Sequence, residues 1–271
     1  MAPVYPSTDA HTHPERLHAR MNEELWVAAS VEAGVRRWVL AAADPAQWPE
    51  LQTCAQRLAR TPGCGAALCL GVHPWWVDGL EPQAIAERIE SLAEHPDIDG
   101  IGETGLDFAR ARGDAARNTQ RMAFQWHLEL AHHRNLPVVL HIVRAMGNAL
   151  AMVAALDLPP AGGMVHAWSG APEMVQPALD LGLHLSIGPA VLSVERVRAS
   201  VPAIPADRLL IETDCPDGRL PEREFSQPAD LLTVAAAVAE LRGESTQAVL
   251  EQTSRNAADL FPILEVPDGP A

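Results

Sequence analysis

Short apolar runs alternate with longer amphipathic stretches along most of the chain. The apolar runs predict an opening strand before His11 and seven more strands, over residues 37–43, 66–72, 98–102, 137–143, 163–166, 184–187 and 208–213. The stretches between them predict helices over about 16–33, 46–60, 81–94, 115–134, 145–156, 172–181 and 193–200. A last helical region spans about 228–260 and breaks near Gly243, where Ser245 is placed to cap its second half.

This alternation of strands and helices indicates the fold class. Strands that are apolar almost throughout are typical of a parallel sheet that helices cover. Eight strand–helix units in ~250 residues fit a (β/α)8 TIM barrel better than an open sheet, with the active site at the C-terminal ends of the strands. We expect a single domain over residues 1–264, followed by a flexible C-terminal tail over 265–271.

Length and composition indicate a globular, intracellular protein. The chain has 271 residues, 48% of them hydrophobic, and contains no apolar run near the ~18 residues that a membrane helix needs. Its first residues lack a basic segment followed by an apolar one, so we expect no secretory signal and no membrane partner. The four cysteines form no Cys-x-x-Cys pair, which favours reduced thiols in the cytoplasm. We expect a soluble, cytoplasmic monomer.

Charge narrows the possible chemistry. The net charge is −15, and all 20 basic residues are arginine. Because lysine is absent, the chain cannot be a Schiff-base aldolase, a P-loop ATPase or an enzyme whose metals are bridged by a carboxylated lysine. The acidic balance argues against broad non-specific adhesion to nucleic acid, although a local basic rim or a bound metal can still neutralise phosphate.

Ionisable residues stand at the ends of the predicted strands. His11 and His13 share one face of the first strand, because alternate side chains of a strand point the same way. An isolated His-x-His pair is more often two ordinary polar residues, but four other strands end in further candidates: Glu103, His141, His166 and Asp214. These groups would meet at the C-terminal end of the barrel, where leaving so many of them buried and unpaired would be unfavourable. The pattern therefore predicts bound metal, with two ions expected.

The motifs around these residues resemble one known family, the TatD-type metal-dependent hydrolases of the amidohydrolase-like barrels. The matching stretches follow the family's order over nearly the whole chain: 9–13, 71–74, 102–107, 136–141, 166–170 and 212–216, with 253–256 and 260–261 similar to the closing helix. The resemblance implies two metals bridged by Glu103, one held by His11, His13 and Asp214 and the other by His141 and His166. It also implies a water nucleophile between the metals, whose proton Asp214 accepts.

The chain departs from the family's usual pattern at positions that border the substrate. Val143 stands where an arginine is common after the fifth strand, and Arg144 beside it is placed to compensate. Phe108 replaces a usual tyrosine, and Gln227 stands where an asparagine commonly precedes the proline. These differences affect the expected substrate contacts more than the expected metal ligands.

Four residues are candidates for contact with the substrate: His73, Arg144, Trp76 and Trp168. His73 would lie at the rim after the third strand and contact a phosphate or carboxylate, but a purely structural hydrogen bond fits it equally well. The tryptophans, with Trp75, fall in loops on the same face and could stack on bases, although packing is the commoner role of each alone. Arginines on this side suggest either a positive rim or ordinary solvated charge: Arg110, Arg112, Arg117, Arg144, Arg219 and Arg223.

The leading interpretation is a binuclear metal-dependent hydrolase of phosphodiesters. The resemblance implies a deoxyribonuclease that acts as a 3′-to-5′ exonuclease on single-stranded DNA ends. An alternative with the same chemistry is hydrolysis of small esters, amides or an aminoacyl-tRNA bond, because fold and metals do not determine the substrate. A third is a non-catalytic binding barrel, which the complete set of six ligands disfavours. The histidine-rich site suits Zn, Mn, Ni or Fe, whereas Mg prefers more oxygen ligands.

Overall fold

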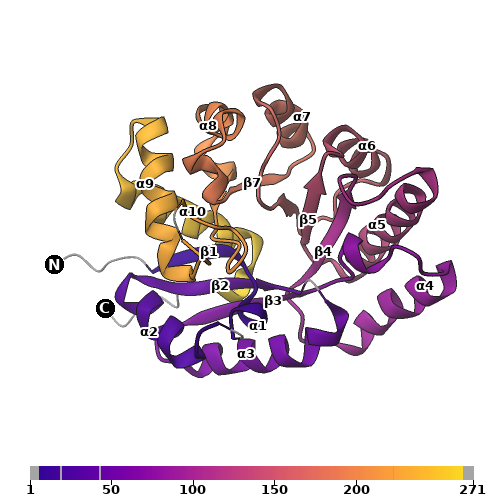
Figure 1. The fold of residues 1–271 in the computed structure, drawn as a ribbon, viewed down its shortest axis with the longest axis horizontal. Helices are drawn as coiled ribbons and strands as arrows, with labels where there is room; N and C mark the ends of the chain where they lie inside the picture. The colour runs from indigo at the N-terminus through magenta and orange to yellow at the C-terminus, as the bar shows by residue number, and fades with distance from the viewer. Residues whose placement is uncertain (1–5, 19, 43, 222, 265–271) are drawn as a thin grey trace.

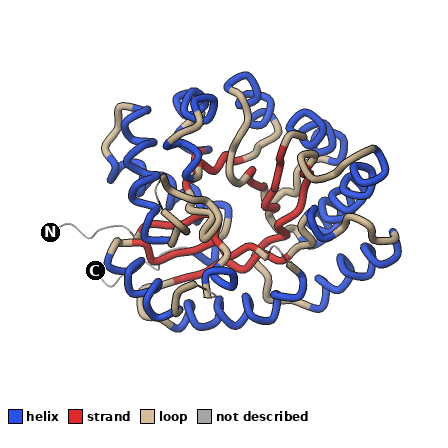
Figure 2. Tube along the Cα trace, in the orientation of Figure 1, coloured by secondary structure: helices blue, strands red, loops and turns tan. Residues whose placement is uncertain are grey.

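Eight parallel strands form a nearly closed barrel that helices surround, which confirms the predicted fold class. The computed structural model describes residues 6–264 except 19, 43 and 222. The strands hydrogen-bond to one another in their order along the chain. Figure 1 and Figure 2 show the strands inside a ring of helices. Residues 1–5 and the expected tail 265–271 lie outside the described residues.

The elements follow the predicted alternation closely. The strands are β1 Ser7–Thr12, β2 Val35–Ala41, β3 Gly65–Leu70, β4 Gly100–Asp107, β5 Val138–Val143, β6 Gly163–Val165, β7 His184–Ile187 and β8 Leu209–Ile211. The helices are α1 Pro14–Leu17, α2 Glu23–Glu32, α3 Trp48–Arg60, α4 Pro82–Glu90, α5 Asp114–Arg134, α6 Met146–Leu156, α7 Val175–Asp180, α8 Glu195–Ser200, α9 Leu231–Arg242 and α10 Thr246–Leu260. Short 3₁₀ turns precede or follow several helices, and one of them, Pro74–Trp76, lies in the loop after β3.

Two of the predicted boundaries are wrong for local physical reasons. The helix expected over 16–33 is two helices, because the side chain of Asn22 accepts the N–H of Glu24 and starts α2 afresh. Glu103 does not end its strand, because β4 continues to Asp107. The break near Gly243 is confirmed: Gly243 has a φ of +66°, and the Ser245 side chain accepts the N–H of Ala248 at 3.1 Å.

Two apolar layers stabilise the barrel. The larger one packs the outer faces of the strands against the surrounding helices, with Trp26, Trp38 and Phe124 wholly buried. The smaller one joins barrel residues such as Val39, Ala67 and Val139 to Phe261, just past the end of α10. Among the described residues, no helix is long and apolar enough to cross a membrane.

Asp9, in β1, hydrogen-bonds to Thr213, which follows β8. Its Oδ1 accepts the backbone N–H of Thr213 at 2.8 Å, and its Oδ2 accepts the Thr213 hydroxyl at 2.5 Å. The backbone N–H of Asp214 then donates to the carbonyl of His11 at 3.0 Å, and that of His13 donates to the carbonyl of Cys215 at 2.9 Å. These bonds bring the ends of β1 and β8 side by side at the C-terminal end of the barrel.

Candidate metal centre

The six expected ligands converge at the C-terminal end of the barrel. They come from five strands: His11 from β1 and His13 just after it, Glu103 from β4, His141 from β5, His166 from the end of β6 and Asp214 from the end of β8. Five of the six line a cavity of about 50 Å³, and His11 is fully buried against them. The structure therefore brings together side chains that are far apart in the sequence.

Local backbone geometry turns two of these residues toward the site. The pairing of β4 with β5 shifts register between Ile101 and Thr104, so that Glu103 lies at an irregularity that re-aims its side chain in mid-strand. Opposite His141, Gly105 has a φ of +133°, and a Cβ there would lie 2.2 Å from the carbonyl oxygen of His141. Only glycine fits this close approach between the two ligand-bearing strands.

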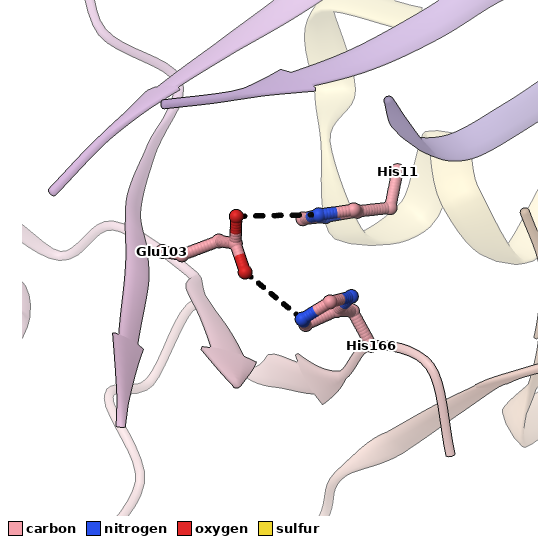
Figure 3. A group of neighbouring side chains, drawn as sticks. All are labelled: His11, Glu103 and His166. Carbon is pink, nitrogen blue, oxygen red and sulfur yellow. Dashed lines mark ion pairs between the residues drawn. The ribbon is translucent and has the colours of Figure 1, made fainter. Parts of the chain in front are cut away.

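Glu103 stands between two pairs of histidines. Its Oε1 lies 3.2 Å from Nε2 of His13 and 3.6 Å from Nε2 of His11. Its Oε2 lies 2.9 Å from Nε2 of His166 and 3.3 Å from Nδ1 of His141. Figure 3 shows one carboxylate oxygen directed at His11 and the other at His166. This is the arrangement of a carboxylate that can bridge two ions.

The spacing of the imidazole nitrogens fits metal ligation. Nε2 of His11 lies 3.2 Å from Nε2 of His13, and Nδ1 of His141 lies 3.0 Å from Nε2 of His166. Two ligands at about 2.1 Å from one ion, in roughly tetrahedral geometry, are about 3.4 Å apart. On the first side Asp214 completes the set, with its Oδ1 3.3 Å from Nε2 of His13. The described residues thus contain candidate metal-binding groups of imidazoles and carboxylates.

Three of the imidazoles have a partner on the nitrogen that faces away from the cluster. Nδ1 of His13 donates to the carbonyl of Ala41 at 2.7 Å. Nε2 of His141 lies 3.6 Å from Oδ2 of Asp107, and Nδ1 of His166 lies 3.4 Å from Oε1 of Glu212. Such outer partners fix the orientation of metal-binding histidines and increase their basicity. The sequence pattern alone does not indicate this role for Asp107 or Glu212.

Electrostatics keep the carboxylates of the centre ionised. Burial alone would raise the pKa of Glu103, but the surrounding imidazoles, His166 foremost, hold that pKa well below its usual range. The pKa of Asp214 is lowered in the same way by its hydrogen bond to His13 and by the charge of His166, against the effect of burial. In return, Glu103 and Asp214 raise the pKa of His13 to about 9 although burial lowers it. The buried carboxylates therefore attract positive charge, which a divalent cation can supply.

His73 is oriented as a hydrogen-bond donor. Its Nδ1 accepts the backbone N–H of Trp75 at 3.1 Å, so a neutral ring carries its proton on Nε2. That Nε2 faces Oε2 of Glu103 at 3.5 Å. Burial and the neighbouring His141 lower the pKa of His73 well below its usual value, so the ring is neutral. A nitrogen that carries a proton cannot ligate a metal, and His73 therefore presents an N–H to the cavity.

The remaining expected substrate residues do not line this cavity. Trp76 is 44% exposed in the turn after β3. Arg144 is exposed at the end of β5, with a φ of +52°, and is not among the residues that line the described cavity. Trp168 is fully buried and packs against Gly170, so a base has no access to its ring. For Trp168 the stacking expectation is therefore withdrawn.

Three of the six arginines of the expected rim are engaged elsewhere. Arg110 stacks over the ring of Trp75, 3.6 Å from its centroid, and Arg223 pairs with Asp230 at 3.1 Å. Arg117 lies over the ring of Phe108. The arginine that does line the cavity is Arg16, which is not among the residues expected from the sequence. Its place three residues after His13, in α1 directly after a strand that carries candidate ligands, was the available signal.

Comparison with known proteins agrees with this geometry. The family described as TatD related DNase matches residues 8–262. The chain belongs to this family. A 3′-5′ ssDNA/RNA exonuclease TatD of Klebsiella pneumoniae (strain 342) is 36% identical over 246 residues, which cover 88% of this chain and 90% of the relative. The protein with the same description from Citrobacter koseri is 34% identical over 248 residues, covering 88% and 92%.

A solved structure extends the likeness to three dimensions. The crystal structure of YJJV, a TATD homolog from Escherichia coli K12, superposes with a TM-score of 0.83 at 25% sequence identity. The superposition covers 97% of this chain and 100% of that one. The TatD family assignment thus agrees with both the sequence and the barrel.

Proposed function

We propose that this protein is a metal-dependent phosphodiesterase that removes nucleotides from the 3′ ends of single-stranded nucleic acid. The observation that carries the proposal is Glu103, whose two carboxylate oxygens face two separate pairs of histidines. Relatives described as 3′-5′ ssDNA/RNA exonucleases match 88% of this chain, which supports a nucleic-acid substrate. The four free cysteines fit a reducing cytoplasm, and we propose a monomer as the working form.

We propose two divalent ions in the centre. His11, His13 and Asp214 would hold one of them, His141 and His166 the other, and Glu103 would bridge them, in agreement with the distances above. Ions in these positions would supply charge to the phosphoryl oxygens and lower the pKa of a water molecule between them. The mixed nitrogen and oxygen ligands suit Zn, Mn, Ni or Fe, and Mg to a lesser degree.

The chain's own side chains handle the proton and the substrate oxygens. The carboxyl group of Asp214 is 23% exposed, whereas that of Glu103 is almost fully buried, so Asp214 is the carboxylate that water can reach. Asp214 would accept the proton of the attacking water. His73 would donate from Nε2–H to a non-bridging phosphoryl oxygen, because its Nδ1 is already occupied by the N–H of Trp75.

The size of the cavity favours a long substrate over a small ester. A volume of about 50 Å³ is far below the ~300–1,000 Å³ of pockets that enclose a whole small molecule. The reacting group would enter while the rest of the substrate lies over the rim. There Trp76 exposes 44% of its surface and would stack on a base of a single strand.

The proposal is tested with end-labelled substrates on protein reconstituted with Mg or Mn. Single-stranded, duplex and circular DNA are compared with single-stranded RNA, a panel of small esters and amides, and an aminoacyl-tRNA. We expect stepwise shortening of linear single strands from the 3′ end and no cleavage of circles, with Asp214→Asn protein as the matched control. Cleavage of circles at the rate of linear strands would exclude an exonuclease. Turnover of esters or aminoacyl-tRNA without any cleavage of nucleic acid would assign the centre to that other hydrolysis.

A further inference from the structure

Arg16 is the cation at the mouth of the metal centre. It lies in α1, three residues after His13, and its side chain lines the same cavity as Glu103 and Asp214. Of the described residues that line this cavity, Arg16 is the one arginine. The backbone N–H of Arg16 donates to the carbonyl of His13 at 3.0 Å, so the base of its side chain is fixed relative to a ligand.

Asp217 holds the Arg16 guanidinium from the other side of the mouth. Nη2 of Arg16 lies 2.6 Å from Oδ2 of Asp217, and the two side chains are 33% and 39% exposed. Asp217 sits in a turn closed by a hydrogen bond from the N–H of Gly218 to the carbonyl of Asp214, 2.7 Å long. A Cβ at Gly218 would lie 2.2 Å from the carbonyl oxygen of Thr213, so this turn requires glycine and keeps Asp217 facing Arg16.

Arg16 can exchange its partner Asp217 for another anion. An ion pair exposed to this degree contributes little to stability, because water solvates both groups and salt screens them. A phosphate offers the planar guanidinium two oxygens at once, which is a stronger match than a contact through one nitrogen. A phosphate that reaches the mouth can therefore replace Asp217 as the partner of Arg16.

Arg16 places a positive charge among the carboxylates of this mouth. The chain carries a net charge of −15, and the cavity itself is lined by Glu103, Asp214 and Asp217. Two other arginines on this face are outside the lining and already engaged, Arg110 with the Trp75 ring and Arg223 with Asp230. A local cation is needed to offset the repulsion between these carboxylates and a polyanion.

We propose that Arg16 binds a substrate phosphate at the mouth of the metal centre, and that Asp217 holds its guanidinium there until the phosphate replaces the carboxylate. The proposal rests on the proposed nuclease function. Arg16 then favours phosphodiesters over neutral esters. Asp217 competes with the substrate and weakens its binding.

The test compares steady-state cleavage of a labelled single strand by four variants. Arg16→Gln should raise KM about 10- to 100-fold with kcat near that of the wild type, because a charged hydrogen bond to substrate is lost. It should also reduce the slope of log(kcat/KM) against log salt by about 0.7, the value for one phosphate contact on a single strand. Asp217→Asn should lower KM about 2- to 5-fold, because the competing charge is gone. Arg16→Lys should keep the salt slope and recover part of the affinity.

Arg20→Gln is the matched control. Arg20 is 39% exposed, pairs loosely with Glu224 at 3.8 Å and does not line the cavity, so its loss should leave KM and the salt slope unchanged. Bound metal, by elemental analysis, and urea unfolding are measured for every variant.

Three results would overturn the proposal, and they are distinguishable. If wild type cleaves single strands and Arg16→Gln keeps its KM and salt slope, the role of Arg16 fails while the nuclease function stands. If Arg16→Gln loses metal or folded protein, and Asp217→Asn leaves KM unchanged, Arg16 has only a structural role. If wild type neither binds a labelled single strand nor cleaves it, the nuclease function fails and the role of Arg16 fails with it.

Discussion

The backbone N–H of Val72 donates to Nε2 of His127, 3.0 Å away. Val72 directly precedes His73, whose Nε2–H faces the candidate metal centre. The other nitrogen of the His127 ring, Nδ1, donates to the carbonyl of Ala123 at 2.7 Å within α5. Both nitrogens are thus satisfied only when the ring is neutral. His127 therefore ties the loop that carries His73 to the helix outside the barrel.

His127 should make the protein less stable in mild acid. Burial lowers its pKa to about 4, against about 6.5 in an unfolded chain. The unfolded chain therefore binds a proton as the pH falls through 6.5, whereas the fold does not until about 4. Stability is complete above the unfolded pKa and declines below it. Between about pH 7 and about pH 5 we expect a loss of about 2 kcal/mol from this residue.

Urea unfolding at the two pH values checks this expectation. His127→Gln should lack that part of the pH dependence, whatever its own stability at pH 7. His133→Gln, on the exposed face of the same helix, should behave as the wild type. An equal loss in the His127→Gln protein and the wild type would show that the ring is not held neutral.

Metal content is the most direct measurement on the centre. We expect about two divalent ions per chain after reconstitution and complete loss of activity after chelation, with recovery when metal is restored. Replacing His11 and His13 together with alanine should remove one ion and leave the other, because Oε2 of Glu103 faces the separate pair His141 and His166. Protein that retains no metal, yet keeps its activity in chelator, would rule out a metal mechanism.

Asp214→Asn should lower turnover at least ~100-fold, the scale of a lost general base. Asparagine keeps the shape of the side chain but cannot accept the proton of the attacking water. The fold should survive, since the backbone bond from Asp214 to the carbonyl of His11 does not involve the side chain. Single-turnover cleavage and circular dichroism separate the two effects. Near wild-type turnover would mean that another group takes the proton.

Glu212→Gln should weaken metal binding about 10- to 100-fold, the usual effect of losing an outer partner of a ligand. Glu212 is fully buried, and its Oε1 accepts the N–H of Ala167 at 2.7 Å while it faces Nδ1 of His166. The neutral amide would no longer orient or polarise that ring. Metal titration of apo-protein measures the change, with Glu224→Gln, 86% exposed, as the control. Equal affinities would show that Glu212 serves the fold alone.

Trp76→Ala should weaken the binding of single strands, whereas Trp168→Ala should lower the stability of the fold. Trp76 is 44% exposed, and its loss should reduce binding of single strands by about 1–3 kcal/mol while stability is kept. Trp168 is fully buried, and its loss should reduce the free energy of unfolding by about 3–5 kcal/mol. Oligonucleotide binding and urea unfolding on both variants distinguish these effects. A stability loss at Trp76 as large as at Trp168 would contradict the stacking role.

The fold and the convergence of the six candidate ligands were accessible from sequence because they depend on local pattern. Apolar strands and their order follow from periodicity, and the C-terminal ends of parallel strands meet at one end of a barrel. The position of Glu103 within β4 was not accessible, because the register shift before Thr104 arises from pairing with β5. The break before α2 depends on one side-chain cap at Asn22, which a helical pattern of apolar residues does not reveal.

The residues around the ligands were harder to predict. Asp214, with a φ of +49°, lines the cavity, whereas Glu212 of the same motif is fully buried behind His166, a position that the motif alone does not reveal. Trp76 and Trp168 both follow strands, yet tertiary packing buries one and exposes the other. Arg16 was missed because its importance comes from Asp217, which lies near it only after the barrel closes.

The hydrogen bonds between Asp9 and Thr213 join the two ends of the sheet, so the candidate metal centre is completed late in folding. His11 belongs to the first strand and Asp214 follows the last, so one expected metal site does not exist until the two ends of the sheet have met. Contacts between such distant segments require the largest loop closure and depend on most of the chain being in place. A chain still emerging from the ribosome, or one cut before β8, would hold His11 and His13 without Asp214. Nuclease activity would thus begin only in molecules that have finished folding.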